Sequence, residues 1–446
     1  MSDKSVKNQE HIHFIGVCGI SMSGLAVLAK EYGCAVTGSD ISSDIPSVLI
    51  KNNITVYRGH SEDNISDDCD MVVYTGAISE DNVELKYAIS KGIKVVERSE
   101  FLGVICKLYD NVIAIAGTHG KTTTTSMIGH IFDMANLKPT IHMGGISNNF
   151  ESNMVVGDRK YFITEACEYK NSFRYIHSNY AVITSTDPDH MDCYSSVVEL
   201  NNAYQYFAKN SKNLVLVDSV KGIYKKGSIL VGIDDGDIYA TNIEYKDGRY
   251  SFDCYYFGKY LTNFKLYSVG RFNIYNALCA IAVAMEYGIS ISCIYDALIS
   301  YKGVKRRNEK ICDIGGVPVI CDYAHHPTEI SNIISAYKSH YKKVMCIFQP
   351  HTYSRTKLLM NKFITSFKGV KTLIIYKTYP AREQKIDGGD AFDLYKKVKI
   401  SEKNKYIAYT KYKLKKIIYE NIENIDCVLI LGAGNIYNIA KNMLKS

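Results

Sequence analysis

Short apolar runs alternate with amphipathic stretches along most of the chain. The runs that predict β-strands are 12–16, 35–38, 71–74, 93–96, 112–116, 160–164, 180–184, 317–321, 343–348, 372–376 and 427–431. The stretches whose apolar residues recur at helical spacing are 21–32, 121–135, 195–208, 273–287, 328–338 and 435–444. Regular alternation of strands and helices is typical of parallel sheets with helices on both faces. The pattern therefore predicts an α/β protein.

Two breaks divide this pattern into three α/β units. One break falls near Tyr109, just before the apolar run at 112–116, and the other lies at 303–307, before a new strand–loop–helix series. Residues 236–266 differ from the rest because they are rich in Tyr and alternate between apolar and polar positions. Such alternation predicts an antiparallel insertion. We therefore expect domains at residues 1–110, 111–307 and 308–446.

Composition agrees with a folded protein of several domains. The chain has 446 residues, of which 46% are hydrophobic and 22% are charged, so disordered, collagen-like and small disulfide-stapled classes are excluded. The formal net charge of +7 is small for this length and is compatible with anionic small substrates. The 13 cysteines form no C-x-x-C pair, which favours a reducing compartment over a disulfide framework.

The sequence predicts neither secretion nor a membrane span. Residues 1–10 are polar and lack the apolar core of a signal peptide, and no run of about 18 apolar residues occurs. The Lys-rich segment 395–416 is interpreted as a solvated helix face, and no aromatic–basic RNA motif accompanies it. We therefore expect a cytoplasmic protein that binds no nucleic acid and has no obligate protein partner.

The strongest local motif is a glycine-containing loop between a buried strand and a helix. The segment runs IAIAGTHGKTTTT over 113–125. Glycines let backbone N–H groups converge on a phosphate, and the helix N-terminus adds its positive dipole. Lys121 would supply a charge for the β- and γ-phosphates, and the Thr122 hydroxyl is a ligand suited to Mg²⁺. The longer G-x4-G-K-[ST] spacing fails because position 115 is Ile, which leaves the shorter G-T-x-G-K-T form.

A second glycine loop follows the first predicted strand. It reads GVCGISMSG over 16–24, and Asp40 follows at the end of the next strand. This arrangement resembles a dinucleotide fingerprint, which keeps an oxidoreductase as one interpretation. Cys18 and Ser21 break the G-x-G-x-x-G spacing. A pyrophosphate at this helix N-terminus and a simple tight turn of small residues both remain open.

Polar clusters follow several of the predicted strands. Glu165 ends one strand, and the segment 185–192, which contains His190, follows the next. The carboxyl ends of parallel strands share one edge of a sheet, so both clusters should lie beside Lys121. Glu165 and His190 would complete a metal site that bridges ATP phosphates. The alternative is a solvated acidic loop that only caps helices.

The remaining polar clusters are less specific. Asn273 and Asn276 open a predicted helix, where they either cap it or hydrogen-bond adenine. The segments 322–329 and 349–355 place His and Asp residues after two later strands, and the adjacent His325 and His326 do not match a zinc pattern. Four arginines are candidate phosphate or carboxylate clamps, although any one of them alone would be an ordinary surface charge. They are Arg306, Arg307, Arg355 and Arg382.

Taken together, these motifs resemble the Mur ligase family, the ATP-dependent amide ligases of peptidoglycan synthesis. The segments that carry the resemblance are HFIGVCGISMSG (13–24), GTHGKTTTT (117–125), EACEYKNSF (165–173), DPDHMDCY (187–194), RFNIYNAL (271–278), GVKRR (303–307), DYAHHPTEI (322–330), FQPHTYSRT (348–356) and LGAGNIY (431–437). They follow the family order over nearly the whole chain. The resemblance implies a Rossmann-like N-terminal domain for a UDP-sugar, a central P-loop-type ATPase domain with a mixed sheet, and a Rossmann-like C-terminal domain that closes over the site.

The resemblance also implies a role for particular residues. Those that match UDP-sugar contacts are Gly16, Gly19, Ser23, Gly24 and His60. Those that match ATP contacts are Gly117, Thr118, His119, Gly120, Lys121, Thr122, Thr123, Asn273, Asn276, Arg307 and Asp322. The metal positions are Thr122, Glu165 and His190, and the catalytic positions are Lys121, His325, His351 and Arg355. The implied cofactors are ATP and Mg²⁺.

The implied reaction joins L-alanine to the lactyl carboxylate of UDP-N-acetylmuramate through an acyl phosphate. Some positions depart from the common family pattern: Cys18, Ser21, Cys167, Ser185, Phe272 and Thr352. Two alternatives therefore stay open besides the oxidoreductase. One is a sister ligase that attaches a preformed peptide to the same sugar, and the other is a nucleotide-binding regulator with impaired catalysis.

Overall fold

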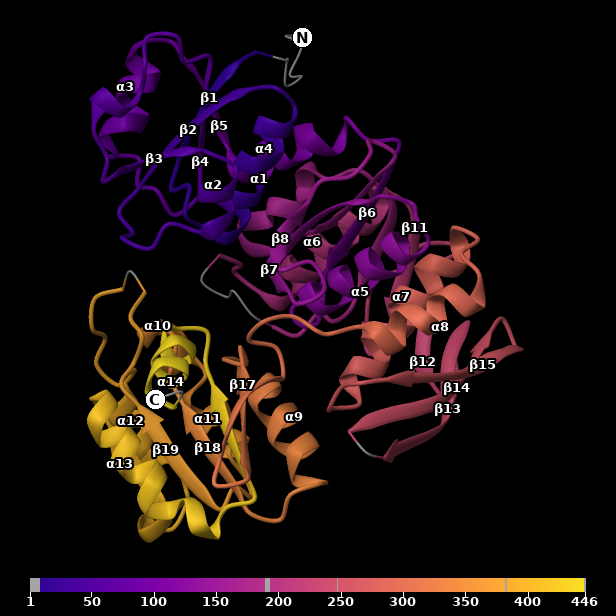
Figure 1. Ribbon diagram of the computed structural model, residues 1–446, viewed down its shortest axis with the longest axis vertical. Helices are drawn as coiled ribbons and strands as arrows, with labels where there is room; N and C mark the ends of the chain where they lie inside the picture. Colours follow the sequence, from indigo (N-terminus) through magenta and orange to yellow (C-terminus); the bar gives the residue numbers. More distant parts are fainter. Residues whose placement is uncertain (1–8, 189–192, 247, 382, 445–446) are drawn as a thin grey trace. The chain divides into compact units, whose positions relative to one another are not determined.

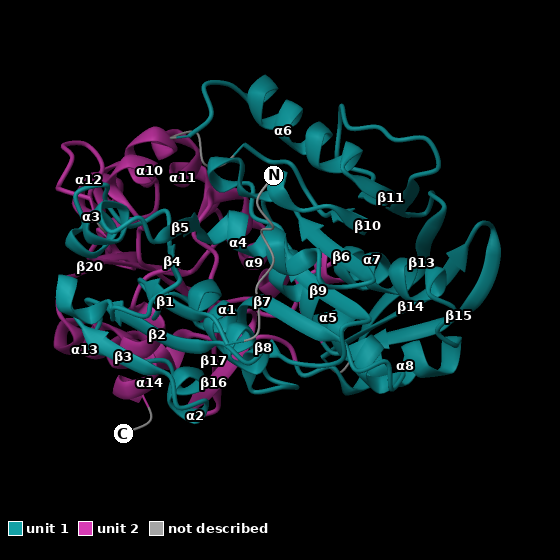
Figure 2. Ribbon diagram, turned by 90° about the horizontal axis from the view of Figure 1, so that it is seen from above, with its two compact units in different colours: residues 1–267, 274–302 teal, residues 268–273, 303–446 magenta. Residues whose placement is uncertain are grey.

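The computed structural model describes residues 9–188, 193–246, 248–381 and 383–444. The chain forms two compact units, coloured separately in Figure 2. Residues 1–267 and 274–302 make up the first unit, and residues 268–273 and 303–446 make up the second. The first unit contains two sheets and the second contains one, each with its own helices (Figure 1). The fold is thus α/β with three domains, as the strand–helix alternation predicts.

The N-terminal domain is a parallel sheet in the order β3-β2-β1-β4-β5. Its strands are β1 (His11–Ile15), β2 (Ala35–Asp40), β3 (Thr55–Arg58), β4 (Met71–Tyr74) and β5 (Lys94–Glu97). Its helices are α1 (Ile20–Glu31), α2 (Ser47–Lys51), α3 (Val83–Ser90) and α4 (Arg98–Cys106), with the short 3-10 helix η1 (Glu62–Asn64). The strand order reverses between β1 and β4, so the loop after β1 lies beside the switch point where such sheets bind ligands.

The central domain is built on a ten-stranded mixed sheet in the order β15-β14-β13-β12-β11-β10-β6-β9-β7-β8. The strands are β6 (Asn111–Ala116), β7 (Thr140–Ser147), β8 (Ser152–Val155), β9 (Tyr161–Glu165), β10 (Ser178–Ile183), β11 (Ser211–Val217), β12 (Ile229–Ile233), β13 (Ile238–Lys246), β14 (Arg249–Tyr256) and β15 (Lys259–Leu266). The helices are α5 (Lys121–Met134), α6 (Val197–Lys209), α7 (Phe272–Glu286) and α8 (Ile291–Ser300), with the 3-10 segment η2 (Tyr169–Tyr175). Strands β13, β14 and β15 pair antiparallel, which confirms the prediction for 236–266.

Strand β6 lies in the middle of this sheet, and its sequence explains why. Residues 112–116 are all buried, with apolar side chains on both faces, as is typical of a strand covered by helices on each side. It pairs in parallel with β10 and β9, so the carboxyl ends of these three strands meet at one edge. Helix α1 of the N-terminal domain packs against β7 and β8, where Asn153 Nδ2 donates to the Ile20 carbonyl at 2.6 Å.

The C-terminal domain is a six-stranded sheet in the order β16-β17-β21-β18-β19-β20. The strands are β16 (Glu309–Ile314), β17 (Val317–Asp322), β18 (Val344–Phe348), β19 (Thr372–Tyr376), β20 (Lys405–Ala408) and β21 (Cys427–Leu431). The helices are α9 (Pro327–Lys338), α10 (Tyr353–Leu358), α11 (Met360–Ser366), α12 (Ala391–Lys397), α13 (Lys411–Asn421) and α14 (Ile436–Leu444), with η3 (Glu402–Asn404) and η4 (Ile422–Asn424). Helices α9, α11 and α12 bury apolar side chains on one face of the sheet, and α13 and α14 on the other.

The sequence pattern misses several short or partly polar elements. The C-terminal domain does not open with an apolar strand, because the half-polar β16 precedes β17 and pairs with it antiparallel. The segment 395–416 is not one helix face, since it contains the end of α12, strand β20 and the start of α13. In the described parts of the chain, no helix is long and apolar enough to span a bilayer.

Candidate active site

The glycine loop at 117–120 joins β6 to α5 at the centre of the middle sheet. Gly117 has φ +136° and Gly120, the N-cap of α5, has φ +85°. Both values lie in the left-handed region that favours glycine. These conformations turn the chain sharply from the end of β6 into the N-terminus of α5, whose first amides have no partner inside the helix. The loop therefore has the backbone geometry of a phosphate site.

The segment after β10 holds this loop in place. The His119 N–H donates to Ser185 Oγ at 2.8 Å, and the Thr118 hydroxyl donates to the Asp187 carbonyl at 2.7 Å. The His119 ring lies 3.0 Å from an Asp187 carboxylate oxygen. Ser185, one of the departures from the family pattern, thus has a structural task here, because its hydroxyl fixes the position of a loop amide.

Lys121 is paired with a buried carboxylate. Its ammonium lies 3.0 and 3.1 Å from the two Glu168 oxygens and also donates to the Gly117 carbonyl. The Glu168 side chain is 2% exposed and that of Lys121 is 17% exposed. Burial on its own lowers the pKa of Lys121, but the Glu168 carboxylate outweighs it and raises the pKa above its ordinary value. The lysine is therefore held as a cation beside the loop, as phosphate binding requires.

Glu165 ends β9 next to the same edge. One of its oxygens accepts a hydrogen bond from the Gly144 N–H, and the Thr122 side chain is nearly buried at the start of α5. His190, the third predicted metal position, lies outside the described residues. No group of three or more His, Cys, Asp or Glu side chains suited to a metal ion occurs among the described residues. A carboxylate and a hydroxyl do fit Mg²⁺, which usually keeps several waters and takes substrate phosphate oxygens as further ligands.

The two asparagines at the start of α7 have different surroundings. Asn276 Oδ1 accepts from the Thr124 hydroxyl at 3.2 Å, and a Cβ at Gly120 would lie 2.5 Å from the same oxygen. Asn276 therefore lies directly beside the phosphate loop. Asn273 Nδ2 donates to Ser268 Oγ at 2.6 Å and to the Val269 carbonyl at 2.9 Å. Asn273 thus holds the turn that precedes the helix.

The first glycine loop follows β1 and is tied to the end of β2. The Ser39 carbonyl accepts from the Gly16 N–H at 2.8 Å, and the Asp40 carboxylate accepts from the Cys18 N–H at 2.9 Å. Gly16 has φ +82°, which favours glycine. The Asp40 side chain is therefore used to hold the loop.

Ser23 and Gly24 lie inside helix α1 and are buried, so they are not part of the loop at 16–19. The Ser23 hydroxyl donates to the Ile20 carbonyl at 3.0 Å. A Cβ at Gly24 would lie 3.2 Å from His142 and 3.2 Å from Asn153, so its small size lets α1 approach β7 and β8. Gly16 and Gly19 are left as the predicted contact residues that lie on the loop itself.

Three of the predicted catalytic residues gather in the C-terminal domain. The His325 and His351 rings are 5.8 Å apart between centroids, and Arg355 Nη1 lies 3.3 Å from His351 Nδ1. Burial, reinforced by the Arg355 cation, lowers the pKa of His351 to about 4. The ring is therefore neutral at pH 7. His326, by contrast, is buried and caps α9.

Asp322, at the end of β17, is a buried carboxylate in the same domain. It accepts hydrogen bonds from the Asn308 N–H at 2.7 Å and the Ala324 N–H at 2.8 Å. Burial raises its pKa to about 6, and the Arg307 cation opposes this shift. Arg307 also lies 3.8 Å from Glu329. Asp322 and Arg307 therefore lie close to each other at the carboxyl end of β17.

Arg306 is used structurally. Its guanidinium donates to the carbonyls of Gly432 at 3.1 Å and Gly434 at 2.7 Å, so it holds the LGAGNIY loop. Both neighbouring guanidinium groups lie over the ring of Tyr323, with Arg306 4.7 Å and Arg307 4.8 Å from the ring centroid. Arg382, the remaining candidate clamp, lies outside the described residues.

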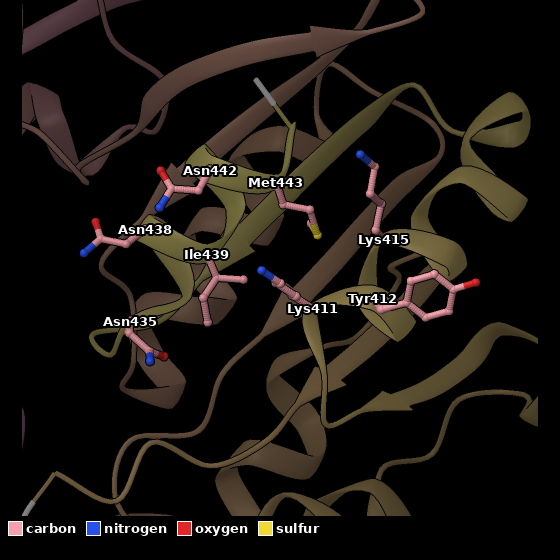
Figure 3. A pocket seen from close by; sticks show the side chains of 8 residues that line it. All are labelled: Lys411, Tyr412, Lys415, Asn435, Asn438, Ile439, Asn442 and Met443. Atoms are coloured by element: carbon pink, nitrogen blue, oxygen red, sulfur yellow. The ribbon is translucent and has the colours of Figure 1, made fainter. Parts of the chain in front are cut away.

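An open hollow of about 510 Å³ lies between α13 and α14 (Figure 3). Its lining residues are Lys411, Tyr412, Lys415, Asn435, Asn438, Ile439, Asn442 and Met443. None of the predicted catalytic residues lines it. The hollow is therefore separate from the His325–His351 cluster.

Several residues that build the site have no role that the sequence reveals. Glu168 stands out only as a second acid after β9, and Glu84, the buried partner of His60, looks like an ordinary polar residue at a helix start. Their importance depends on burial and on partners 47 and 24 positions away along the chain. The one signal that could have found either of them is the position of Glu168 after a predicted strand.

Models of three protein-family domains match this chain in sequence order. They are described as "Mur ligase family, catalytic domain" at residues 11–110, "Mur ligase middle domain" at 115–284 and "Mur ligase, glutamate ligase domain" at 306–434. Together they cover most of the chain. The chain belongs to the Mur ligase family. It is accordingly an ATP-dependent ligase that forms amide bonds.

Within the family, this Mur ligase is similar in sequence and structure to ligases that act on UDP-N-acetylmuramate and alanine. The UDP-N-acetylmuramate–L-alanine ligase of Clostridium acetobutylicum is 40% identical over 452 residues, with 97% of each chain covered. The crystal structure of UDP-N-acetylmuramate–alanine ligase from Thermotoga maritima matches with a TM-score of 0.84 and 26% identity, and 98% of each chain is covered. A murein peptide ligase from Psychrobacter arcticus shares the fold, with a TM-score of 0.71 and 22% identity over 98% of each chain.

Proposed function

We propose that this Mur ligase joins L-alanine to the lactyl carboxylate of UDP-N-acetylmuramate, with ATP converted to ADP and phosphate, in peptidoglycan precursor synthesis. The observation that carries the proposal is the loop at 117–120 with the Lys121 cation beside it. The identity to ligases of this name over nearly the full length supports the choice of substrates. We assign the UDP-sugar to residues 1–110, ATP to 111–307 and the amino-acid step to 308–446.

The reaction needs an activated carboxyl group, because an amide does not form favourably from a carboxylate and an ammonium in water. A carboxylate oxygen attacks the γ-phosphorus, the bond from that phosphorus to the β–γ bridging oxygen breaks, and ADP leaves. The alanine nitrogen then attacks the carbonyl carbon of the acyl phosphate. The C–O bond to phosphate breaks, the nitrogen loses a proton, and the amide and inorganic phosphate are released.

The residues of this chain supply position and charge for these steps. The N-terminal amides of α5 and Lys121 bind the phosphates, and the ammonium, which now contacts Glu168, turns toward the phosphate oxygens when ATP binds. Thr122 and Glu165 would hold Mg²⁺, which neutralises charge on the β- and γ-phosphates. His351 is neutral at pH 7 and is our candidate acceptor for the amine proton, with His325 as its neighbour.

The remaining assignments complete the two binding sites. Gly16, Gly19 and His60 would contact the UDP-sugar, and Asn276, Arg307 and Asp322 are assigned to ATP. Arg355 would offset charge on the transferring phosphate. Closure of the C-terminal domain would exclude water from the acyl phosphate.

The test is phosphate release from ATP with UDP-N-acetylmuramate against a panel of acceptors. We expect release to require both the sugar nucleotide and L-alanine. Release with a tripeptide in place of L-alanine would identify the sister ligase, and no release with any acceptor would identify a regulator. Stabilisation against heat by NAD would favour an oxidoreductase.

The role of Lys121 is tested by Lys121→Ala. We expect phosphate release to fall by at least about 10²-fold, with UDP binding retained, because the loss removes a preorganised cation from the phosphate site. Lys212→Ala, an exposed lysine in the same domain, is the matched control.

The acyl phosphate is tested with UDP-N-acetylmuramate whose lactyl carboxylate is labelled with ¹⁸O. One labelled oxygen should be transferred to the released phosphate, and retention of all the label in the sugar product would exclude the acyl phosphate.

A further inference from the structure

Glu84 is a fully buried carboxylate at the start of α3, and it binds His60. Its Oε2 lies 3.0 Å from His60 Nδ1 and accepts from the Ser39 hydroxyl at 2.5 Å. Its Oε1 accepts from Asn64 Nδ2 at 2.6 Å and from the Ser61 N–H at 3.3 Å. Both oxygens are therefore used as acceptors by groups that surround His60.

The carboxylate is kept ionised although it is buried. Burial raises the pKa of Glu84, but the nearby His13 ring and the hydrogen bonds from Ser39 and Asn64 outweigh it and hold the pKa at about 2. His13, itself fully buried, places Nε2 3.9 Å from the Glu84 carboxylate. A buried charge with this many partners costs much to disturb, which makes it a rigid anchor.

This anchor is connected to the first glycine loop through Ser39. The Ser39 hydroxyl binds Glu84, and its carbonyl accepts from the N–H groups of Gly16 at 2.8 Å and Val17 at 3.1 Å. The carbonyl of the next residue, Asp40, accepts from the Gly59 N–H at 2.7 Å, immediately before His60. The loop after β1, the end of β2 and the turn after β3 thus form one hydrogen-bonded unit at the carboxyl ends of three neighbouring strands.

The exposure of the two side chains differs in a useful way. The His60 side chain is 16% exposed, whereas that of Glu84 is 0% exposed. An ionised carboxylate accepts only, so His60 must donate Nδ1–H to it. In the neutral ring, Nε2 then carries the lone pair and is the acceptor. The tautomer of His60 is thus set by a group that no ligand can reach.

We propose that Glu84 is a positioning residue for sugar-nucleotide binding: it fixes the orientation and tautomer of His60, so that Nε2 accepts a hydrogen bond from the UDP moiety. The ribose hydroxyls and the uracil N3–H are the donors on that moiety. The inference rests on the proposed function, because it takes the UDP-sugar as the ligand of the N-terminal domain. Glu84 itself does not touch the ligand.

The test measures UDP affinity by calorimetry for wild type, Glu84→Gln, His60→Ala and the double variant. Glutamine has the same shape but only one acceptor, so its NH₂ group must face a donor on one side or the other. We expect Glu84→Gln to weaken UDP binding about tenfold, which corresponds to about 1.4 kcal/mol. The matched control is Glu80→Gln, an exposed carboxylate just before the same helix, which should leave the affinity unchanged.

The double variant separates positioning from a general structural effect. If Glu84 acts through His60, the double variant should bind UDP no more weakly than His60→Ala alone. An additive loss, or no loss in Glu84→Gln, overturns the proposal. Affinity for an ATP analogue should stay unchanged in every variant, and a parallel loss of ATP affinity would also overturn it.

Two further arms keep the result decisive. If Glu84→Gln does not fold, Asn64→Ala removes one hydrogen bond from the carboxylate, and it should weaken UDP binding only when His60 is present. Equal weakening by Asn64→Ala with and without His60, or none, counts against the proposal. If wild type binds no UDP, the proposed function itself fails, and this outcome is distinct from wild type binding with Glu84→Gln unaffected.

Discussion

The conformation of Gly117 gives the sharpest prediction for the phosphate loop. Gly117 has φ +136°, and a Cβ at this position would overlap Thr184 Oγ1 and lie 2.9 Å from the Ser185 N and 3.1 Å from the Ser185 carbonyl oxygen. Two of these atoms belong to the backbone, which cannot rotate away. The Gly117→Ala variant must therefore strain the backbone and move the loop away from the segment after β10.

The loss of folding stability expected in Gly117→Ala has two parts. Placing a Cβ on left-handed backbone costs roughly 1–2 kcal/mol, and forcing an extra carbon into a packed site costs about 1–3 kcal/mol more. Gly227→Ala is the matched control, because Gly227 has φ +79° in the same domain, but apart from Gly227 and its two chain neighbours no atom of the described residues lies within 4 Å of the place where its Cβ would be. The control should lose only the first part. Each kcal/mol lowers the unfolding midpoint by about 2–4 °C at this domain size.

The assay combines thermal unfolding with ATP-dependent phosphate release. A displacement near 1 Å at a reacting centre costs about 10²-fold in rate, so Gly117→Ala should lose activity on this scale while Gly227→Ala keeps it. The same unfolding midpoint in both variants, together with wild-type turnover in both, would show that Gly117 is not needed for the conformation of the loop.

Two more predictions concern the metal and the histidine cluster. Glu165→Gln should raise the Mg²⁺ concentration needed for half-maximal turnover, because it removes a charged ligand; an unchanged Mg²⁺ titration would exclude Glu165 from the metal site. Arg355→Gln should raise the pKa of His351 above its value of about 4, because the guanidinium contributes to that lowering after burial. Since the folded-state pKa of His351 lies below its unfolded value near 6.5, the native state binds fewer protons between these values, so stability rises with pH across that window and is lost as pH falls through it. Removing Arg355 should make stability depend less steeply on pH in this window, as measured by the unfolding midpoint at a series of pH values. NMR titration of His351 should show the raised pKa, and the same pKa in Arg355→Gln and wild type would contradict this prediction.

Local patterns in the sequence are sufficient to predict the strands whose ends carry the candidate site. The run at 112–116 has to be buried on both faces, and the glycine loop after it has to turn into a helix, so these patterns alone predict Lys121 at the start of that helix, beside a candidate phosphate loop. The histidines at 325 and 351 follow two strands of one sheet, and this order brings their rings to 5.8 Å. In each case the residue and the element that positions it are neighbours in the chain.

The pattern fails where polar residues serve elements far away in the chain. Arg306 looks like an anion clamp in the sequence, yet its guanidinium is used on the carbonyls of Gly432 and Gly434. Strand β16 is half polar because it lies at the edge of its sheet, and periodicity alone does not identify it. The role of such a polar residue depends on which distant groups are buried next to it when the chain folds.

Short-range patterns of apolar, glycine and charged residues are enough to predict the α/β class, the strand before the glycine loop at 117–120 and the family. The folded chain adds what these patterns do not contain: Lys121 is paired with Glu168, Ser185 holds the loop, and Glu84 binds His60. The physical reason is burial, because a carboxylate acquires such a role only when folding encloses it and brings distant donors to its oxygens.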